Sequence, residues 1–173
     1  MIRFFILILY LFSVNCFSQQ YISNNGEITF FSYAPIEDIK AKNKKVSAVY
    51  DFSTSEIVFQ LYISDFNFRK KLMQTHFNEN YLESDKYPKS TFVGKVIELK
   101  EDNAKVKGLL SIHGVTKEIE VSGTLIKKKS TVSLLSEFKI KLDDFNISIP
   151  KIVIYKIAEV ILVNIDIELK LTE

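Results

Sequence analysis

The chain has 173 residues, of which 47% are hydrophobic, 25% charged and 13% aromatic. These values are typical of one globular domain, and they exclude a disordered chain and a membrane protein with many spans. The formal net charge of +2 gives no electrostatic basis for nucleic-acid binding, and a single cysteine excludes a disulfide scaffold or a cysteine-rich metal site.

The N-terminus has the pattern of an export signal. Arg3 precedes an apolar run over residues 4–12, which is too short for a bilayer core that needs about 20 residues. Such a run is typical of a secretory signal peptide, and the polar residues after it place cleavage after Ser18. We therefore predict a signal peptide over 1–18 and one domain over 19–173, periplasmic or secreted, with no transmembrane segment in the mature chain.

Two other interpretations of this segment stay open. Cys16 would be lipidated in a bacterial lipoprotein, but that site requires a small residue where Asn15 stands. The apolar run would otherwise be a buried first strand. Cleavage after Ser18 leaves a mature chain without cysteine, so its fold depends on packing alone.

Apolar and polar residues alternate along most of the remaining chain, which is the period of β-strands. The third strand also carries Val58 and Tyr62 on its second face, which predicts cover on both sides. The pattern predicts eight strands, over residues 27–33, 45–52, 56–64, 90–99, 104–112, 117–125, 131–142 and 156–171.

Eight amphipathic strands must hide one apolar face and their edges. Eight is also the number at which a barrel interior is wide enough for side chains or for one small ligand. Periodicity therefore favours an all-β, antiparallel barrel, and it leaves an open sandwich as the alternative.

One helix interrupts the strands. Within residues 66–83, apolar residues that include Leu72, Met73 and Phe77 recur at helical spacing, and Pro88 prevents continuation. We predict one α-helix between the third and fourth strands, lying over one end of the barrel. The lysine runs at 42–45 and 127–129 predict hairpin tips.

Motifs of catalysis and metal binding are missing from the sequence: it has no glycine-rich phosphate loop, no GxSxG elbow and no HExxH. His113 precedes Gly114, which supplies the positive φ that a tight turn needs, so His113 belongs to a turn or makes a polar contact at the barrel rim. Asp144 is expected to accept backbone N–H bonds in a bend. We predict no enzyme activity, no cofactor and no metal.

Three segments resemble the YceI-like family of exported proteins, in the right order over roughly residues 24–171. They are Met73, His76 and Phe77 with Tyr81–Pro88 and Phe92; Gly108–Lys117, which is the most specific; and Asp144–Ile147 before the long final strand. The resemblance implies an eight-stranded, lipocalin-like antiparallel barrel with a helix over it. It also implies an elongated apolar pore for an isoprenoid or another long amphiphile.

The third segment departs from the family pattern. Leu142 and Asp143 stand where family members often carry an arginine, so the resemblance does not support a head-group contact there. Asn146 replaces a glycine, and because Asn tolerates the left-handed backbone conformation, we expect the bend to persist.

We therefore expect a carrier for a hydrophobic small molecule with a polyprenyl or fatty-acyl chain. One alternative is a structural or interaction domain whose barrel is filled by its own side chains. Another is an enzyme, or a haem or metal carrier, that uses His76 and His113. The sequence leaves a homodimer open. The expected ligand-binding residues are Phe30, Phe59, Leu61, Phe92, Leu110, Ile112, Val121, Phe138, Ile140, Ile161 and Val163, with His76 and His113 as polar contacts.

Overall fold

The computed structural model describes residues 19–33, 38–149 and 157–172. The predicted signal peptide and Cys16 lie outside these ranges. The described strands are β1 (Gln20–Ser32), β2 (Ile39–Asp51), β3 (Glu56–Tyr62), β4 (Asn67–Phe68), β5 (Lys89–Lys100), β6 (Asn103–Ile112), β7 (Val115–Lys127), β8 (Thr131–Lys141) and β9 (Val160–Leu171). The helical segments are η1 (Ile63–Asp65), α2 (Lys71–His76), η2 (Phe77–Tyr81) and η3 (Leu142–Phe145).

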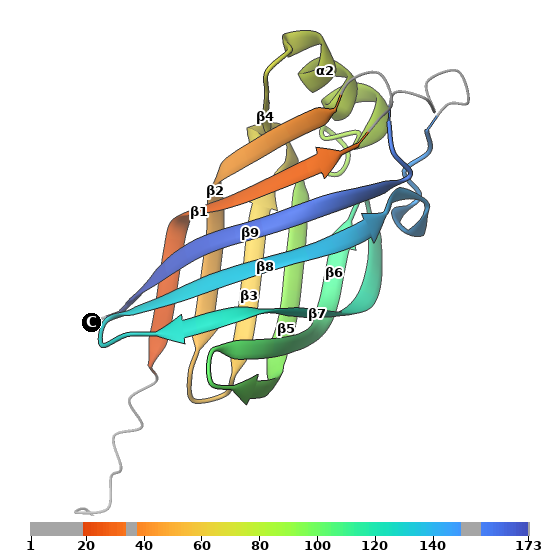
Figure 1. The fold of residues 1–173 in the computed structure, drawn as a ribbon. Helices are drawn as coiled ribbons and strands as arrows, with labels where there is room; N and C mark the ends of the chain where they lie inside the picture. Colours follow the sequence, from red (N-terminus) through yellow and green to blue (C-terminus); the bar gives the residue numbers. More distant parts are fainter. Residues whose placement is uncertain (1–18, 34–37, 150–156, 173) are drawn as a thin grey trace, which may run out of the picture.

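Eight of the strands form a closed antiparallel barrel (Figure 1). Each strand pairs with the next one along the chain, and β9 pairs with β1 to close the wall. The two-residue β4 lies outside this circuit and pairs with β2 through Ala41 and Phe68. The predicted barrel is confirmed, and the sandwich alternative is wrong because the β1–β2 and β1–β9 pairings leave no open edge on β1.

The alternation of side chains explains the barrel interior. Along β8, Val132, Leu134 and Ile140 are buried, whereas the residues between them are more exposed. Strand β1 begins seven residues earlier than its alternation predicts, because the register shifts around Gly26 and interrupts the pattern. A Cβ at Gly26 would lie 2.7 Å from Cγ1 of Ile167, so close strand packing requires glycine there.

Two predictions about β2 and β3 are wrong. The lysine run at 42–45 lies inside β2 instead of at a hairpin tip, because Asn43 is fully buried there and its Nδ2 donates to the Tyr62 carbonyl at 2.9 Å. The second face of β3 is open to solvent, with Val58 37% and Tyr62 45% exposed. The other lysine run, 127–129, does lie at the β7–β8 connection, as predicted.

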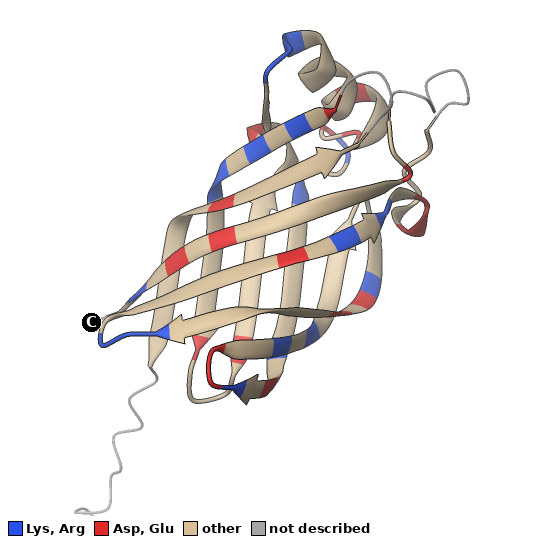
Figure 2. Cartoon of the chain, in the orientation of Figure 1, with Lys and Arg blue, Asp and Glu red and all other residues tan. Residues whose placement is uncertain are grey.

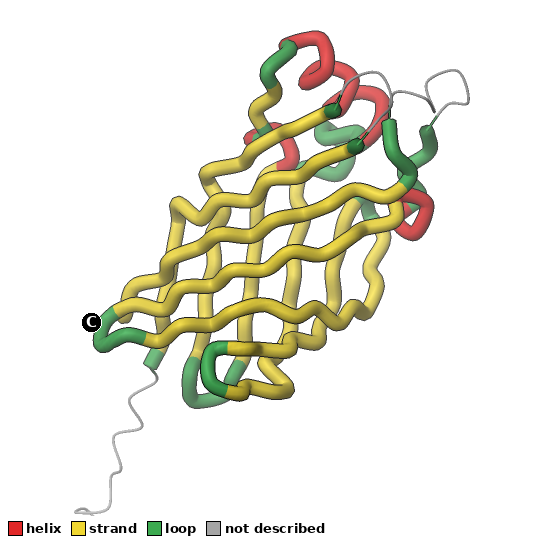
Figure 3. The backbone as a smooth tube through the Cα atoms, in the orientation of Figure 1, coloured by secondary structure: helices red, strands yellow, loops and turns green. Residues whose placement is uncertain are grey.

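The helical region covers one end of the barrel, called here the helix end (Figures 1 and 3). It is shorter than residues 66–83, because 67–68 pair with β2 and the helix begins only at Lys71. The segment continues as the π-helical η2, and its position between the third and fourth barrel strands is as predicted. Within the described ranges, no helix combines the length and apolarity that a bilayer crossing requires.

Candidate functional site

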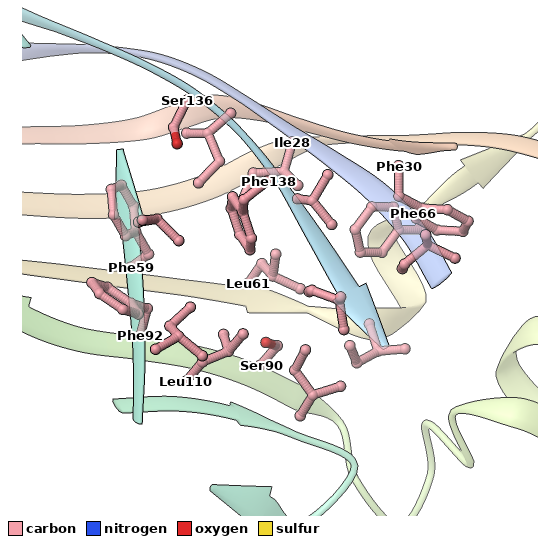
Figure 4. Close-up of a pocket in the computed structure, with 18 of the residues that line it drawn as sticks. Ile28, Phe30, Phe59, Leu61, Phe66, Ser90, Phe92, Leu110, Ser136 and Phe138 are labelled. Carbon is pink, nitrogen blue, oxygen red and sulfur yellow. The ribbon is translucent and has the colours of Figure 1, made fainter. Parts of the chain in front are cut away.

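A cavity of about 580 Å³ occupies the barrel interior next to the helix end. This volume lies in the range of about 300–1,000 Å³ that is typical of small-molecule pockets. Figure 4 shows aromatic and aliphatic side chains of several strands pointing into it. The lining includes twelve of the thirteen predicted residues: Phe30, Phe59, Leu61, His76, Phe92, Leu110, Ile112, Val121, Phe138, Ile140, Ile161 and Val163.

The opposite end of the barrel, called here the closed end, is filled by its own side chains. It lies where β9 ends, at the C label of Figure 1. Its residues do not line the cavity, and they are almost completely buried: Tyr21, Val46, Ala48, Tyr50, Val132, Ile167 and Leu169. The barrel thus combines a packed core at one end with open space at the other.

A pair of glycines keeps space open in the wall of β5 and β6. Gly94 and Gly108 are register partners, and both follow the inward alternation of Phe92 and Leu110. A Cβ at Gly108 would lie 2.5 Å from the Gly94 Cα and 2.7 Å from Cζ of Phe92. The Phe92 ring therefore lies against a wall without side chains and leaves the lumen beside it free.

An aromatic cluster covers the cavity at the helix end. The Phe77 ring lies 5.5 Å from Phe30, 5.7 Å from Phe66 and 4.9 Å from Phe68, measured between centroids. All four residues line the cavity. Phe66, Phe68 and Phe77 were absent from the predicted site, although the helical spacing of Phe77 and the alternation of Phe66 with Phe68 carried a signal.

Three serine hydroxyls of the cavity lining have hydrogen-bond partners in the barrel itself. Ser90 donates to the Ser111 carbonyl at 2.9 Å, and Ser136 donates to the Ser122 carbonyl at 2.8 Å. Ser32 accepts from the Ala158 N–H at 2.7 Å. These groups are engaged with the barrel's own backbone, which leaves an interior suited to hydrocarbon.

Two polar side chains, those of His76 and Tyr81, line the cavity near the helix end. The Nδ1 atom of His76 lies 3.0 Å from Oδ1 of Asn80, one helical turn away, and His76 is exposed. Burial raises the pKa of the Tyr81 phenol, so this group stays protonated as a donor at neutral pH. The structure therefore places His76 at the rim of the cavity.

His113, the remaining predicted residue, is not among the residues that line the cavity. Its side chain is 10% exposed, with Nδ1 3.2 Å from the Phe145 carbonyl and Nε2 2.9 Å from Oε2 of Glu83. It forms the tight β6–β7 turn with Gly114, at φ values of 50° and 75°. The turn interpretation is thus supported, and the imidazole connects this hairpin to two distant loops.

The bend after β8 is partly as predicted. Asn146 adopts the left-handed conformation with φ 54°, and it ends η3. Asp144 lies within η3 and accepts a hydrogen bond from Nζ of Lys117 at 2.8 Å, instead of capping the backbone as predicted. That hydrogen bond holds the pKa of the Asp144 carboxyl below its ordinary value.

The two histidines do not form a common site. His76 lines the cavity, whereas His113 is held by Glu83 and Phe145. Across residues 19–33, 38–149 and 157–172, no group of three or more His, Cys, Asp or Glu side chains is placed to hold a metal ion. A shared haem or metal ligand is therefore not supported by this arrangement.

Known proteins share this architecture. The crystal structure of Burkholderia cenocepacia BcnA has 17% identity, covers 83% of this chain and 95% of that protein, and has a TM-score of 0.74. A polyisoprenoid-binding domain from Saccharophagus degradans, implicated in plant cell wall breakdown, has 11% identity, coverage of 90% and 99%, and a TM-score of 0.76. The Campylobacter jejuni YceI protein has 24% identity, coverage of 82% and 90%, and a TM-score of 0.68.

At these identities the structural similarity shows the fold alone. None of the curated proteins matches the sequence. The model of the YceI-like domain matches residues 21–170, which is most of the chain and includes every barrel strand except the ends of β1 and β9. The protein therefore belongs to the YceI-like domain family.

Proposed function

We propose that this protein is an exported, non-catalytic carrier of a long apolar or amphiphilic molecule, of the isoprenoid, quinone or fatty-acyl type. The observation that carries the proposal is the cavity of about 580 Å³ inside the barrel, lined mainly by aliphatic and aromatic side chains. The structural relative from Saccharophagus degradans, described as a polyisoprenoid-binding domain, supports the same ligand class.

The energetics of such a cavity favour chain length over chemical detail. Each methylene moved from water into an apolar lining contributes about 0.8 kcal/mol, so ten of them give roughly 8 kcal/mol before the costs of association. Ser90 and Ser136, which point into the cavity in Figure 4, are engaged with backbone carbonyls. Little in the lining then discriminates between tails of similar length.

The same arrangement supports a role without catalysis. General acid–base or nucleophilic chemistry needs a nucleophile, a base and an orienting group within hydrogen-bond reach of each other. His76, the histidine that lines the cavity, contacts the Asn80 amide, and within the described part of the chain it has no hydrogen bond to a hydroxyl nucleophile. Binding without turnover is the simplest use of this interior.

Export is the part of the proposal that the N-terminal sequence supports. Residues 1–18 have the charge, apolar run and polar end of a cleaved signal peptide. The intact mass of the protein recovered from its own cells tests it, and we expect a mature N-terminus at Gln19. A retained N-terminus, or a mass increased by acyl chains on Cys16, would contradict export as a free carrier.

Binding is tested with a series of saturated fatty acids, from octanoic to octadecanoic acid, by isothermal titration calorimetry on residues 19–173. We expect the affinity to rise about tenfold for every two methylenes until the chain fills the cavity, and then to level off. Each titration uses acid below its aggregation limit. Affinities that do not depend on chain length, or an absence of binding throughout, would contradict the proposal.

A further inference from the structure

The pairing of β7 with β8 covers only part of the two strands, so the barrel wall opens between them. These strands pair only from Lys127↔Val132 to Gly123↔Ser136, although both continue well beyond the last pair. If the same register continued, Glu120 would face Lys139. In Figure 1 the two ribbons diverge from this point toward the helix end. We call the opening between residues 117–122 and 137–144 the β7–β8 slit.

A pocket of about 400 Å³ lies along the slit. It is lined by both diverging strands and by η3. One end is the Gly123↔Ser136 pair, reinforced by the Ser136 hydroxyl donating to the Ser122 carbonyl at 2.8 Å. At the other end, the Lys117–Asp144 ion pair of 2.8 Å crosses from β7 to η3. On β7 these ends, Lys117 and Gly123, are six positions apart, which corresponds to about 20 Å.

The slit and the central cavity share one wall. Five residues line both of them: Leu110, Ile119, Val121, Phe138 and Ile140. The cavity lining also includes Ser122 and Gly123 on one edge of the opening and Leu135 and Ser136 on the other. An apolar chain in the lumen can therefore reach this part of the wall without leaving apolar surroundings.

The outer rim of the slit is polar and nearly balanced in charge. Glu118 and Glu120 alternate with the inward residues of β7, and Lys139 and Lys141 do so on β8. Figure 2 shows charged residues of both signs on these two strands. Glu118 pairs with Lys107 of β6, on the side away from the slit, at 3.0 Å. The two strand edges also carry backbone N–H and C=O groups that are not used in a β7–β8 ladder.

We infer that the β7–β8 slit is the lateral opening through which the amphiphile enters and leaves, and that its polar end lies there while its chain lies in the barrel. This inference rests on the proposed function and adds a second binding site to it. Apolar side chains continue from the lumen to the inner side of the slit, and hydrogen-bonding groups of both signs of charge form its rim. A chain with a polar end matches that order.

The first test links the strands across the slit. Residues 19–173 contain no cysteine, so the variant E120C/K139C can be joined by a short bismaleimide at two outward positions. The control is T124C/L135C, whose residues are partners in the paired part of the same strands. The probe is cis-parinaric acid, whose fluorescence rises in apolar surroundings, followed by stopped-flow.

We expect the linked slit variant to bind and release the probe at least about tenfold more slowly, with little change in Kd, because a gate alters both rates together. The linked control and both unlinked variants should exchange like the parent protein. Equal rates in the linked slit variant would overturn the lateral opening. Failure of the parent protein to bind the probe would instead overturn the proposed function, and this inference with it.

The second test locates the polar end. A stearoyl chain with a nitroxide on its polar end should broaden the backbone amide NMR signals of Glu120 and Lys139 and spare those of Leu72 and His76 at the helix end. The diamagnetic, reduced nitroxide is the control. Broadening at Leu72 and His76 without broadening at Glu120 and Lys139 would overturn the inference even if the chain binds in the barrel.

Discussion

Val163→Phe distinguishes an open barrel from a filled one. Val163 of β9 points into the lumen between its register partners Phe30 and Phe138, and all three line the cavity. The substitution adds four carbon atoms to the side chain. In a core without space, such overpacking costs about 1–3 kcal/mol.

Because the barrel contains a cavity, we expect Val163→Phe to stabilise the protein instead of destabilising it. Four buried carbons at about 0.8 kcal/mol each give roughly 3 kcal/mol, from which about 1 kcal/mol is lost through ordering the ring. Val163→Phe should then raise the free energy of unfolding by about 1–2 kcal/mol. The same ring occupies the volume of about four ligand methylenes, so a long fatty acid should bind about 100-fold more weakly.

Urea unfolding and calorimetric titration with octadecanoic acid measure both effects. Val93→Phe is the matched control, because Val93 is 54% exposed on the outer face of β5 and should change neither quantity by much. Destabilisation by Val163→Phe together with unchanged fatty-acid affinity would refute the reasoning, since both results require a filled interior.

Three further outcomes follow from the wall and the helix end. Phe77→Ala removes the ring at the centre of the aromatic cluster, so hydrogen exchange across residues 71–82 should accelerate. The free energy of unfolding should fall by about 2 kcal/mol, which is less than for a core phenylalanine because Phe77 is only half-buried. Unchanged exchange would show that the cluster does not hold the helix. Gly108→Ala should lower the melting temperature by more than about 10 °C, because the new Cβ would lie 2.5 Å from backbone atoms of β5. A melting temperature within about a degree or two of the parent's would show that the wall of β5 and β6 can relax at this position. In an NMR pH titration, the Asp144 carboxyl should titrate below its ordinary pKa of 3.8, and its pKa should rise in Lys117→Ala because the main cause of the lowering is removed. Any stability that the Lys117–Asp144 ion pair contributes is therefore present above pH 3.8 and is lost as the pH falls through the depressed pKa of Asp144. An identical titration midpoint in both proteins would contradict the Lys117–Asp144 contact.

Local sequence patterns predicted the parts of the fold that depend on local physics. The β6–β7 hairpin is an example, because alternation defines both strands and a two-residue turn at His113 and Gly114 fixes their register. Alternation along the barrel strands also predicted twelve of the residues that line the cavity. The need to hide one apolar face favoured closure into a barrel, but the alternation alone left an open sandwich as the alternative.

The incorrect predictions concern residues whose roles depend on distant partners. Asn43 gives a charged segment the appearance of a loop, yet it is buried within β2 because the Tyr62 carbonyl accepts its amide hydrogen. His113 lies in the turn that its sequence predicts, but local sequence could not show that Glu83 and Phe145, each about thirty positions away, bind both of its ring nitrogens. Alternation also could not show where β7 and β8 separate, because both strands keep their pattern beyond the last pair.

The central claim, that a guest chain lies inside the barrel, is tested most directly by NMR on methyl-labelled protein with perdeuterated background. With uniformly protonated octadecanoic acid bound, we predict intermolecular NOEs from the chain to the methyl groups of Ile28, Ile161 and Val163 in the lumen. The outward methyl groups of Val93 and Leu109 should show none. NOEs confined to those outward methyl groups would contradict the account, because the chain would then lie on the outer surface of β5 and β6.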